Sequence, residues 1–187
     1  MSCGGSSGKP PSGENLEIGR KDTWRPVTAR RYTAQSPLTW REGESLRTAA
    51  GVAHLTFSDG TRLSLNADSE IRMDGATPSA IRLSGGDVYA LVPKPAGQPQ
   101  AVLFLIRTDE AEARVTGTEF GVKKQADHTE VAVVEGSVVC AAPKGEVPVK
   151  AGQLTSVRPN AAPARPKPFD AKTYFAWLQA HHAPGKH

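Results

Sequence analysis

Residues that could act as nucleophiles, bases or metal ligands are few and scattered along this chain of 187 residues. His54 lies in a predicted strand and His128 in a predicted loop, and no Gly-x-Ser-x-Gly turn or Cys-His pair accompanies them. Cys140 lies in an apolar stretch, where a buried and inert thiol is usual. His181, His182 and His187 have no cysteine or carboxylate beside them and are typical of a solvated tail. We therefore expect no enzyme activity, no metal site and no cofactor.

The carboxylates and glycines of the central region support the same expectation. Asp109, Glu110 and Glu112 flank a predicted strand on a polar turn, where acidic residues usually serve solubility. No predicted helix follows Gly86, Gly117 or Gly136, so these glycines lack the helix N-terminus that a phosphate site needs. We expect them to serve backbone geometry.

The elements that carry these residues are predicted to be short strands. The chain has 18 Gly and 15 Pro, a density that interrupts long helices. The stretch 52–57 and the stretch 61–65 alternate in polarity around Asp59-Gly60, which favours a hairpin that depends on Gly60. The longest apolar run, 101–106, is too short to cross a membrane and is predicted to be a strand buried on both faces.

The stretches 115–122 and 129–138 form the centre of the predicted core. Both show the period of two that buries one face of a strand, and a short polar loop joins them, which indicates a second hairpin. Phe120 is the largest apolar residue of the pair and is expected to fill the core. Gly117, Gly86 and Gly136 are expected at bends.

These stretches resemble the FecR domain family. The likeness rests on Val115-x-Gly-Thr-x-Phe-x-Val122 and on the valine-rich strand that ends in Glu135-Gly-x-Val138. It continues upstream in Phe57-Ser-Asp-Gly60 and Leu83-Ser-Gly-Gly86-Asp-Val88, and downstream in 149–157. The resemblance covers residues from about 40 to 158. It implies the extracytoplasmic sensory domain of bacterial envelope proteins.

The expected fold is therefore all-β: a compact β-solenoid or β-sandwich of short strands, with a short C-terminal α-helix on a Pro-rich spacer. A weak internal repeat agrees with stacked hairpins, because 81–88 and 131–138 share the spacing of two apolar residues, a glycine and a valine. We expect four segments: a flexible Gly/Ser/Pro tether (1–15), the FecR-like β domain (16–158), the Pro-rich spacer (159–168), and a C-terminal helix with a basic tail (169–187).

The tether has a cysteine, Cys3, followed by Gly, Ser and Pro residues. This composition cannot form a packed core. It resembles the start of a mature bacterial lipoprotein, so one interpretation is a lipid anchor at Cys3, and the other is a plain linker.

The stretch after the spacer is the one convincing helix. Asp170 is a natural N-cap, and Phe169 and Tyr174 have the spacing of a hydrophobic staple. A helix of about ten residues is unstable alone in water, so its apolar face must be buried. It is predicted either to clasp the domain's own sheet or to contact a partner, through the residues Phe169, Tyr174, Phe175, Trp177 and Leu178.

The sequence thus favours a non-enzymatic protein-interaction or scaffold domain of the bacterial envelope, as a lipoprotein subunit of a larger assembly. The alternative is the periplasmic sensory part of a FecR-type anti-sigma regulator. The expected partners are other envelope proteins, with a periplasmic or outer-membrane location and membrane contact only through Cys3. Nucleic-acid or carbohydrate binding would need more exposed aromatic residues beside basic ones than Tyr89 and Arg82. From residue 143 onward seven basic residues face two acidic ones, which we interpret as a solvated basic tail. No sequence feature assigns an oligomeric state.

Overall fold

The computed structural model describes most of the predicted β domain and the C-terminal helical region. The described residues are 16–20, 23–27, 40–57, 59–74, 80–94 and 104–180. Cys3 with the rest of the tether, and the three terminal histidines, lie outside them. The described residues form 15 strands connected in one hydrogen-bonded network, with two short helices near the end. This is the all-β class expected. No described helix is both long and apolar enough to cross a membrane.

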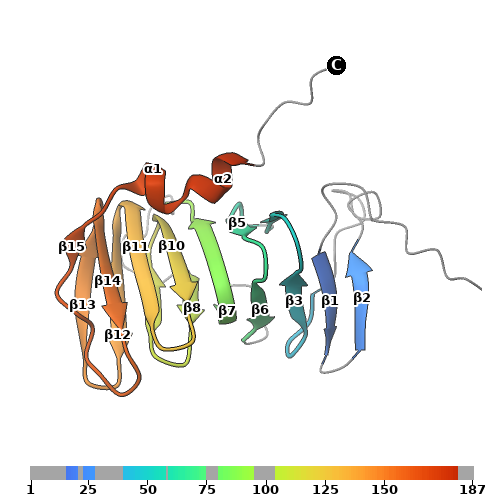
Figure 1. Ribbon diagram of the computed structural model, residues 1–187, viewed down its shortest axis with the longest axis horizontal. Helices are drawn as coiled ribbons and strands as arrows, with labels where there is room; N and C mark the ends of the chain where they lie inside the picture. Colours follow the sequence, from blue (N-terminus) through green and yellow to red (C-terminus); the bar gives the residue numbers. More distant parts are fainter. Residues whose placement is uncertain are drawn as a thin grey trace, which may run out of the picture.

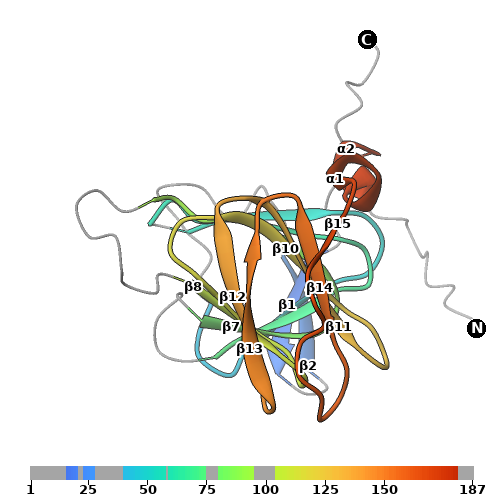
Figure 2. The same cartoon turned by 90° about the vertical axis from the view of Figure 1, so that its left-hand side faces the viewer.

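The strands form two layers that are joined through the long strand β7 (Figures 1 and 2). All pairings are antiparallel except that of β7 with β8. The first layer contains β2 (Thr23–Val27), β1 (Leu16–Arg20), β3 (Ser45–Thr48), β6 (Glu70–Met73), the first half of β7 (Ala80–Leu91), β8 (Phe104–Arg107), β9 (Glu112–Val115), β12 (Ser137–Ala142) and β13 (Gly145–Lys150). The second layer contains β4 (Ala53–Thr56), β5 (Arg62–Leu65), the second half of β7, β10 (Glu119–Lys124), β11 (Thr129–Glu135), β14 (Gln153–Val157) and β15 (Lys167–Pro168).

One apolar core lies between the two layers. Alternate residues of each strand point inward, as the period of two requires. The largest fully buried side chains come from both layers: Phe104, Ile18, Leu46 and Ile81 from the first, and Phe120, Leu63, Leu65 and Val88 from the second. Phe120 has no exposed surface.

The chain passes between the layers at glycine corners. Gly85 of β7 pairs with β6 in the first layer, whereas Gly86 pairs with β10 in the second. Gly86 has φ +87°, and a Cβ there would lie 2.3 Å from Ser69 Oγ. Gly117, between β9 and β10, has φ +109°, and a Cβ there would lie 2.8 Å from Lys94 Cα. Residues other than glycine rarely adopt such φ values. At both positions their Cβ atom would also collide with a neighbouring segment.

These corners explain the internal repeat. The segment 81–88 carries β7 from the first layer to the second, and 131–138 carries the chain from β11 in the second layer to β12 in the first. In both segments the apolar residues are buried on either side of the glycine. The repeated spacing is therefore that of a strand that changes layer while keeping its apolar side chains in the core.

One strand differs from expectation. The run 101–106 is expected to be buried on both faces; residues 101–103 lie outside the described residues, and the rest, in β8, alternates, with Phe104 and Ile106 buried and Leu105 half-buried. The reason is that the outer face of the first layer is not covered by a helix at this strand.

The corner and the core residue of the central hairpin give the first prediction. Replacing Gly117 with Val forces a Cβ against Lys94, and replacing Phe120 with Ala leaves a cavity, so each should lower the free energy of unfolding by about 2 to 4 kcal/mol. Urea unfolding measures this. Gly85→Ala is the matched control, because a Cβ at Gly85 meets nothing within 4 Å. Unfolding free energies equal to that of the parent chain would refute the assignment.

Candidate functional site

The C-terminal segment, residues 169–180, lies across the outer face of the second layer (Figure 1). It forms α1 (Ala171–Tyr174) and α2 (Ala176–Ala180) in place of the single helix expected. The break is at Phe175, whose φ of −104° and ψ of 28° leave the helical region. Asp170 caps α1 as predicted, since its side chain accepts a hydrogen bond from the Lys172 N–H.

Phe175 fills a socket on this outer face. The floor of the socket is Gly121 of β10 and Ala132 of β11, which are cross-strand partners. A Cβ on Gly121 would lie 2.4 Å from Phe175 Cε1, so only glycine leaves room for the ring. Tyr89 packs edge-on against the ring with centroids 4.8 Å apart, and Leu154 belongs to the same cluster. Phe175 is 6% exposed as a result.

Tyr174 fixes the segment by a polar contact beside the socket. Its hydroxyl donates a hydrogen bond of 2.8 Å to Glu130 Oε2 on β11. Burial, together with the nearby Glu130 carboxylate, raises the pKa of Tyr174 above its ordinary value. Phe169 packs edge-on against Tyr174 with ring centroids 5.5 Å apart, the contact expected of the hydrophobic staple.

The Pro-rich spacer runs along the edge of the second layer. The Ala164 N–H donates to the Ser156 carbonyl at 2.9 Å, and the Thr155 hydroxyl donates to the Ala164 carbonyl at 2.6 Å. Three residues farther on, β15 begins at Lys167 and pairs with β14. These contacts hold the start of the C-terminal segment close to its socket, so that little extra ordering is needed for docking.

The structure therefore brings the five predicted partner-binding residues together on the domain's own sheet. Phe175 is buried, whereas Phe169, Tyr174, Trp177 and Leu178 are half-buried. Binding of a partner by these residues stays a prediction. Sequence reasoning missed the socket, because Gly121 and Ala132 come together only through strand pairing.

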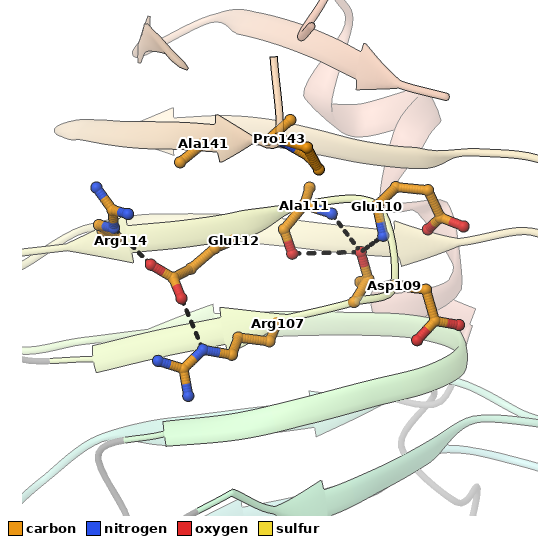
Figure 3. A pocket seen from close by; sticks show the side chains of 10 residues that line it. Arg107, Asp109, Glu110, Ala111, Glu112, Arg114, Ala141 and Pro143 are labelled. Atoms are coloured by element: carbon orange, nitrogen blue, oxygen red, sulfur yellow. Dashed lines mark hydrogen bonds and ion pairs between the residues drawn. The ribbon is translucent and has the colours of Figure 1, made fainter. Parts of the chain in front are cut away.

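A second concave site lies at the turn between β8 and β9, with a volume of about 280 Å³ (Figure 3). Glu112 accepts hydrogen bonds from Arg107 Nε at 2.6 Å and from Arg114 Nε at 2.5 Å. Burial alone would raise the pKa of Glu112, but the two guanidinium groups outweigh it and lower the pKa below its usual value. A carboxylate held ionised between two arginines is a poor general base. This pocket is therefore an ion-pair network with no catalytic pair.

A buried polar network lies beside that pocket and connects the two layers. Lys124 Nζ lies 2.8 Å from Glu110 Oε1, and the two side chains are only 8% and 6% exposed. Thr129 donates from its hydroxyl to Glu110 Oε2 at 2.8 Å. The network joins the β8–β9 turn to the β10–β11 hairpin. Glu110 thus has a structural role, which its place on a predicted polar turn did not indicate.

The catalytic candidates of the sequence do not converge. His54 Nδ1 lies 2.9 Å from Ser64 Oγ on the exposed face of β4 and β5, and His128 contacts Asp127 at 2.8 Å in a hairpin turn. Burial raises the pKa of the Cys140 thiol to about 12, so it is un-ionised at neutral pH. Over the described part of the chain, no group of three or more His, Cys, Asp and Glu side chains is placed to hold a metal ion.

The buried ion pair predicts a pH dependence. Burial raises the pKa of Glu110, but the hydrogen bonds from Lys124 and Thr129 outweigh it, so the pKa is below the ordinary 4.5. The pair therefore stabilises the fold fully above about pH 5, and this contribution is lost as the pH falls through the lowered pKa. Urea unfolding between pH 3 and pH 7 measures it. Glu110→Gln should be less stable at pH 7 and should lose less stability on acidification. If the free energy of unfolding fell equally with decreasing pH in the parent chain and in Glu110→Gln, the prediction would be contradicted.

The socket predicts a specific effect of two substitutions. Phe175→Ala empties the socket and Gly121→Val blocks it, so each should lower the free energy of unfolding by about 2 to 4 kcal/mol. The double variant should cost little more than either single one, because both remove the same contact. Val139→Ala, which is half-buried on the outer face of the first layer and away from the socket, is the control. Additive losses in the double variant would show that Phe175 does not occupy this socket.

Comparison with known proteins places the chain in a family. The sequence model of the family described as "FecR protein" matches residues 44–139, which is more than half of the chain. The match begins just before β3 and ends within β12, and it includes the corners at Gly86, Gly117 and Gly136. No curated protein matches.

Solved structures agree with that match. Two crystal structures, at 1.65 and 2.50 Å resolution, of a "putative anti-sigma factor" from Parabacteroides distasonis ATCC 8503 share the fold with a TM-score of 0.61 and 26% sequence identity. The match covers 72% of this chain and 64% of that protein. Our chain therefore aligns with less than two thirds of the solved protein. The motifs, the corner glycines and the fold together show that this chain belongs to the FecR family.

Proposed function

We propose that this chain is the extracytoplasmic sensory part of a FecR-type regulator, which passes a signal to an anti-sigma pathway through protein contacts. The observation that carries the proposal is the match of the layer-changing core to the FecR family, together with the likeness to the solved "putative anti-sigma factor". The sequence favoured a scaffold subunit, with this regulator as the alternative. The comparisons support the alternative better.

The architecture suits a module that works by binding. The corners and the buried Glu110–Lys124 pair hold the two layers in a fixed relation, so a partner meets a preformed surface. The half-buried aromatic residues of the C-terminal segment are the contact we propose for one partner, since tryptophan and tyrosine often dominate binding energy. Trp177 is the residue we choose to test, because it lies beside Asp87 and Lys123 and is only half-buried there.

The location that goes with this function is the periplasm, with Cys3 as a lipid anchor. If Cys3 is acylated, the native protein will fractionate with membranes, and Cys3→Ala will release it to the soluble fraction.

The decisive experiment compares transcripts in the native bacterium with and without the gene. We expect deletion to change expression of a set of genes that share one alternative-sigma promoter type. The complete gene should restore the pattern, and the same gene carrying Trp177→Ala should restore it only in part. Lys172→Ala, exposed on α1, is the matched control and should restore it fully. If deletion leaves the transcripts unchanged but an envelope protein complex dissociates, the chain is a scaffold subunit and the regulator proposal is wrong.

A further inference from the structure

The C-terminal segment is held on the domain by few buried contacts. Over residues 169–179, whose exposure the structure describes, Phe175 alone is buried. Helix α1 has four residues, none of them buried, and α2 has five. Helices of this length are unstable by themselves in water. The shape of the segment therefore depends on the seating of Phe175 in its socket.

The docked segment also packs imperfectly at its edge. Trp177 is only half-buried, and a space of about 10 Å³ remains between it and the strands at Asp87 and Lys123. That volume is at the lower limit for one water molecule. Asp87 Oδ1 is buried and has no hydrogen-bond partner among the described residues. A buried acceptor without a donor is costly, so this contact is less favourable than the packing of the core, where Phe120 and Phe104 are at most 1% exposed.

The socket and its occupant belong to different parts of the chain. The residues that match the family model, 44–139, include Tyr89, Gly121 and Ala132 of the socket, whereas the segment lies beyond the end of that match. The Pro-rich spacer joins the two. A site and a ligand joined by a short tether meet at an effective concentration in the millimolar range. Even a weak contact of this kind keeps the socket closed.

We propose that the socket is a docking site for a short aromatic segment of a partner protein, and that the chain's own C-terminal segment holds it closed until the partner segment displaces it. The present occupant shows which chemistry fits. An aromatic ring enters the hollow above Gly121, and a neighbouring hydroxyl donates to Glu130. A helical turn that carries an aromatic residue beside a hydrogen-bond donor meets both requirements. That the partner is a protein rests on the proposed function.

The tether favours a partner protein over a second copy of this chain. The segment of a second copy has the same residues as the segment already docked, so below millimolar concentration the tethered segment wins the competition. A partner segment that also supplies a donor to Asp87 gains what the chain's own segment lacks. Displacement exposes Trp177 as well, so opening of the socket and the partner contact proposed above act in the same direction.

The test uses the full chain and a fluorescein-labelled peptide with the sequence of residues 168–180, followed by fluorescence anisotropy. We expect the parent chain to bind the peptide weakly but to saturation, because its own segment competes. The full chain with Phe175→Ala has an empty socket and should bind at least tenfold more tightly. Gly121→Val fills the hollow and should abolish binding, whereas Val139→Ala should bind as the parent does. A peptide with Phe175→Ala is the control ligand and should bind to none of them.

Amide hydrogen exchange of the parent chain, without peptide, shows directly whether the segment opens. The N–H groups of Phe175 and Leu178 donate to carbonyls of the segment itself, at 3.0 Å each. They should exchange at least a hundredfold faster than the amides of Val131 and Val133 in the core, because release of the segment leaves the domain folded.

Several results would overturn the proposal. These are exchange of the segment as slow as that of the core, no binding by the Phe175→Ala chain, and equal binding by the Gly121→Val chain. A parent chain that sediments as a dimer, and becomes a monomer on Gly121→Val, would assign the socket to a second copy instead. None of these measurements depends on transcripts, so failure of the socket as a docking site is distinguishable from failure of the proposed function.

Discussion

The structure depends on one constraint: a single chain must change layers repeatedly without exposing its core residues. Several of these changes are made at sharp corners where another segment lies in close contact. At Gly117 the neighbour is the backbone of Lys94, and at Gly86 it is Ser69. Glycine meets both demands at once, since it tolerates positive φ and occupies no side-chain volume. The residues that match the family model include both of these corners.

The two outer faces of the sandwich carry different kinds of side chain. The second layer carries small residues at Gly121 and Ala132, and these accept the ring of Phe175 from the chain's own C-terminal segment. The first layer carries ion pairs in place of a covering helix, and a row of three arginines, Arg72, Arg82 and Arg107, crosses three of its strands. One face is thus covered by apolar packing within the chain, and the other presents charge outward. The two faces therefore differ in chemistry: the C-terminal segment presents half-buried aromatic residues on one, and ion pairs lie on the other.

Buried and exposed ion pairs of this domain contribute differently to its stability. The Glu110–Lys124 pair is buried and hydrogen-bonded, so breaking it by removing one partner is costly. The pairs on the first layer's outer face are more exposed and contribute little each to stability. Among them, Arg82 has a buried Nε without a hydrogen-bond partner among the described residues, although its terminal nitrogens lie within ion-pair distance of Asp74 and Asp109.

The sequence by itself determined the fold class, the central hairpin, the Asp59-Gly60 turn and the family, because alternation, turn chemistry and the spacing of glycines are local properties. It also marked the C-terminal segment as amphipathic. It did not reveal what that segment covers: Gly121 and Ala132 are eleven positions apart, and only the register of β10 against β11 makes them one socket. Nor did it reveal the arginine row, since Arg72, Arg82 and Arg107 become neighbours only when β6, β7 and β8 pair. Local patterns decide what each strand is, whereas cross-strand register decides which side chains meet, and register is set by the packing of the whole core.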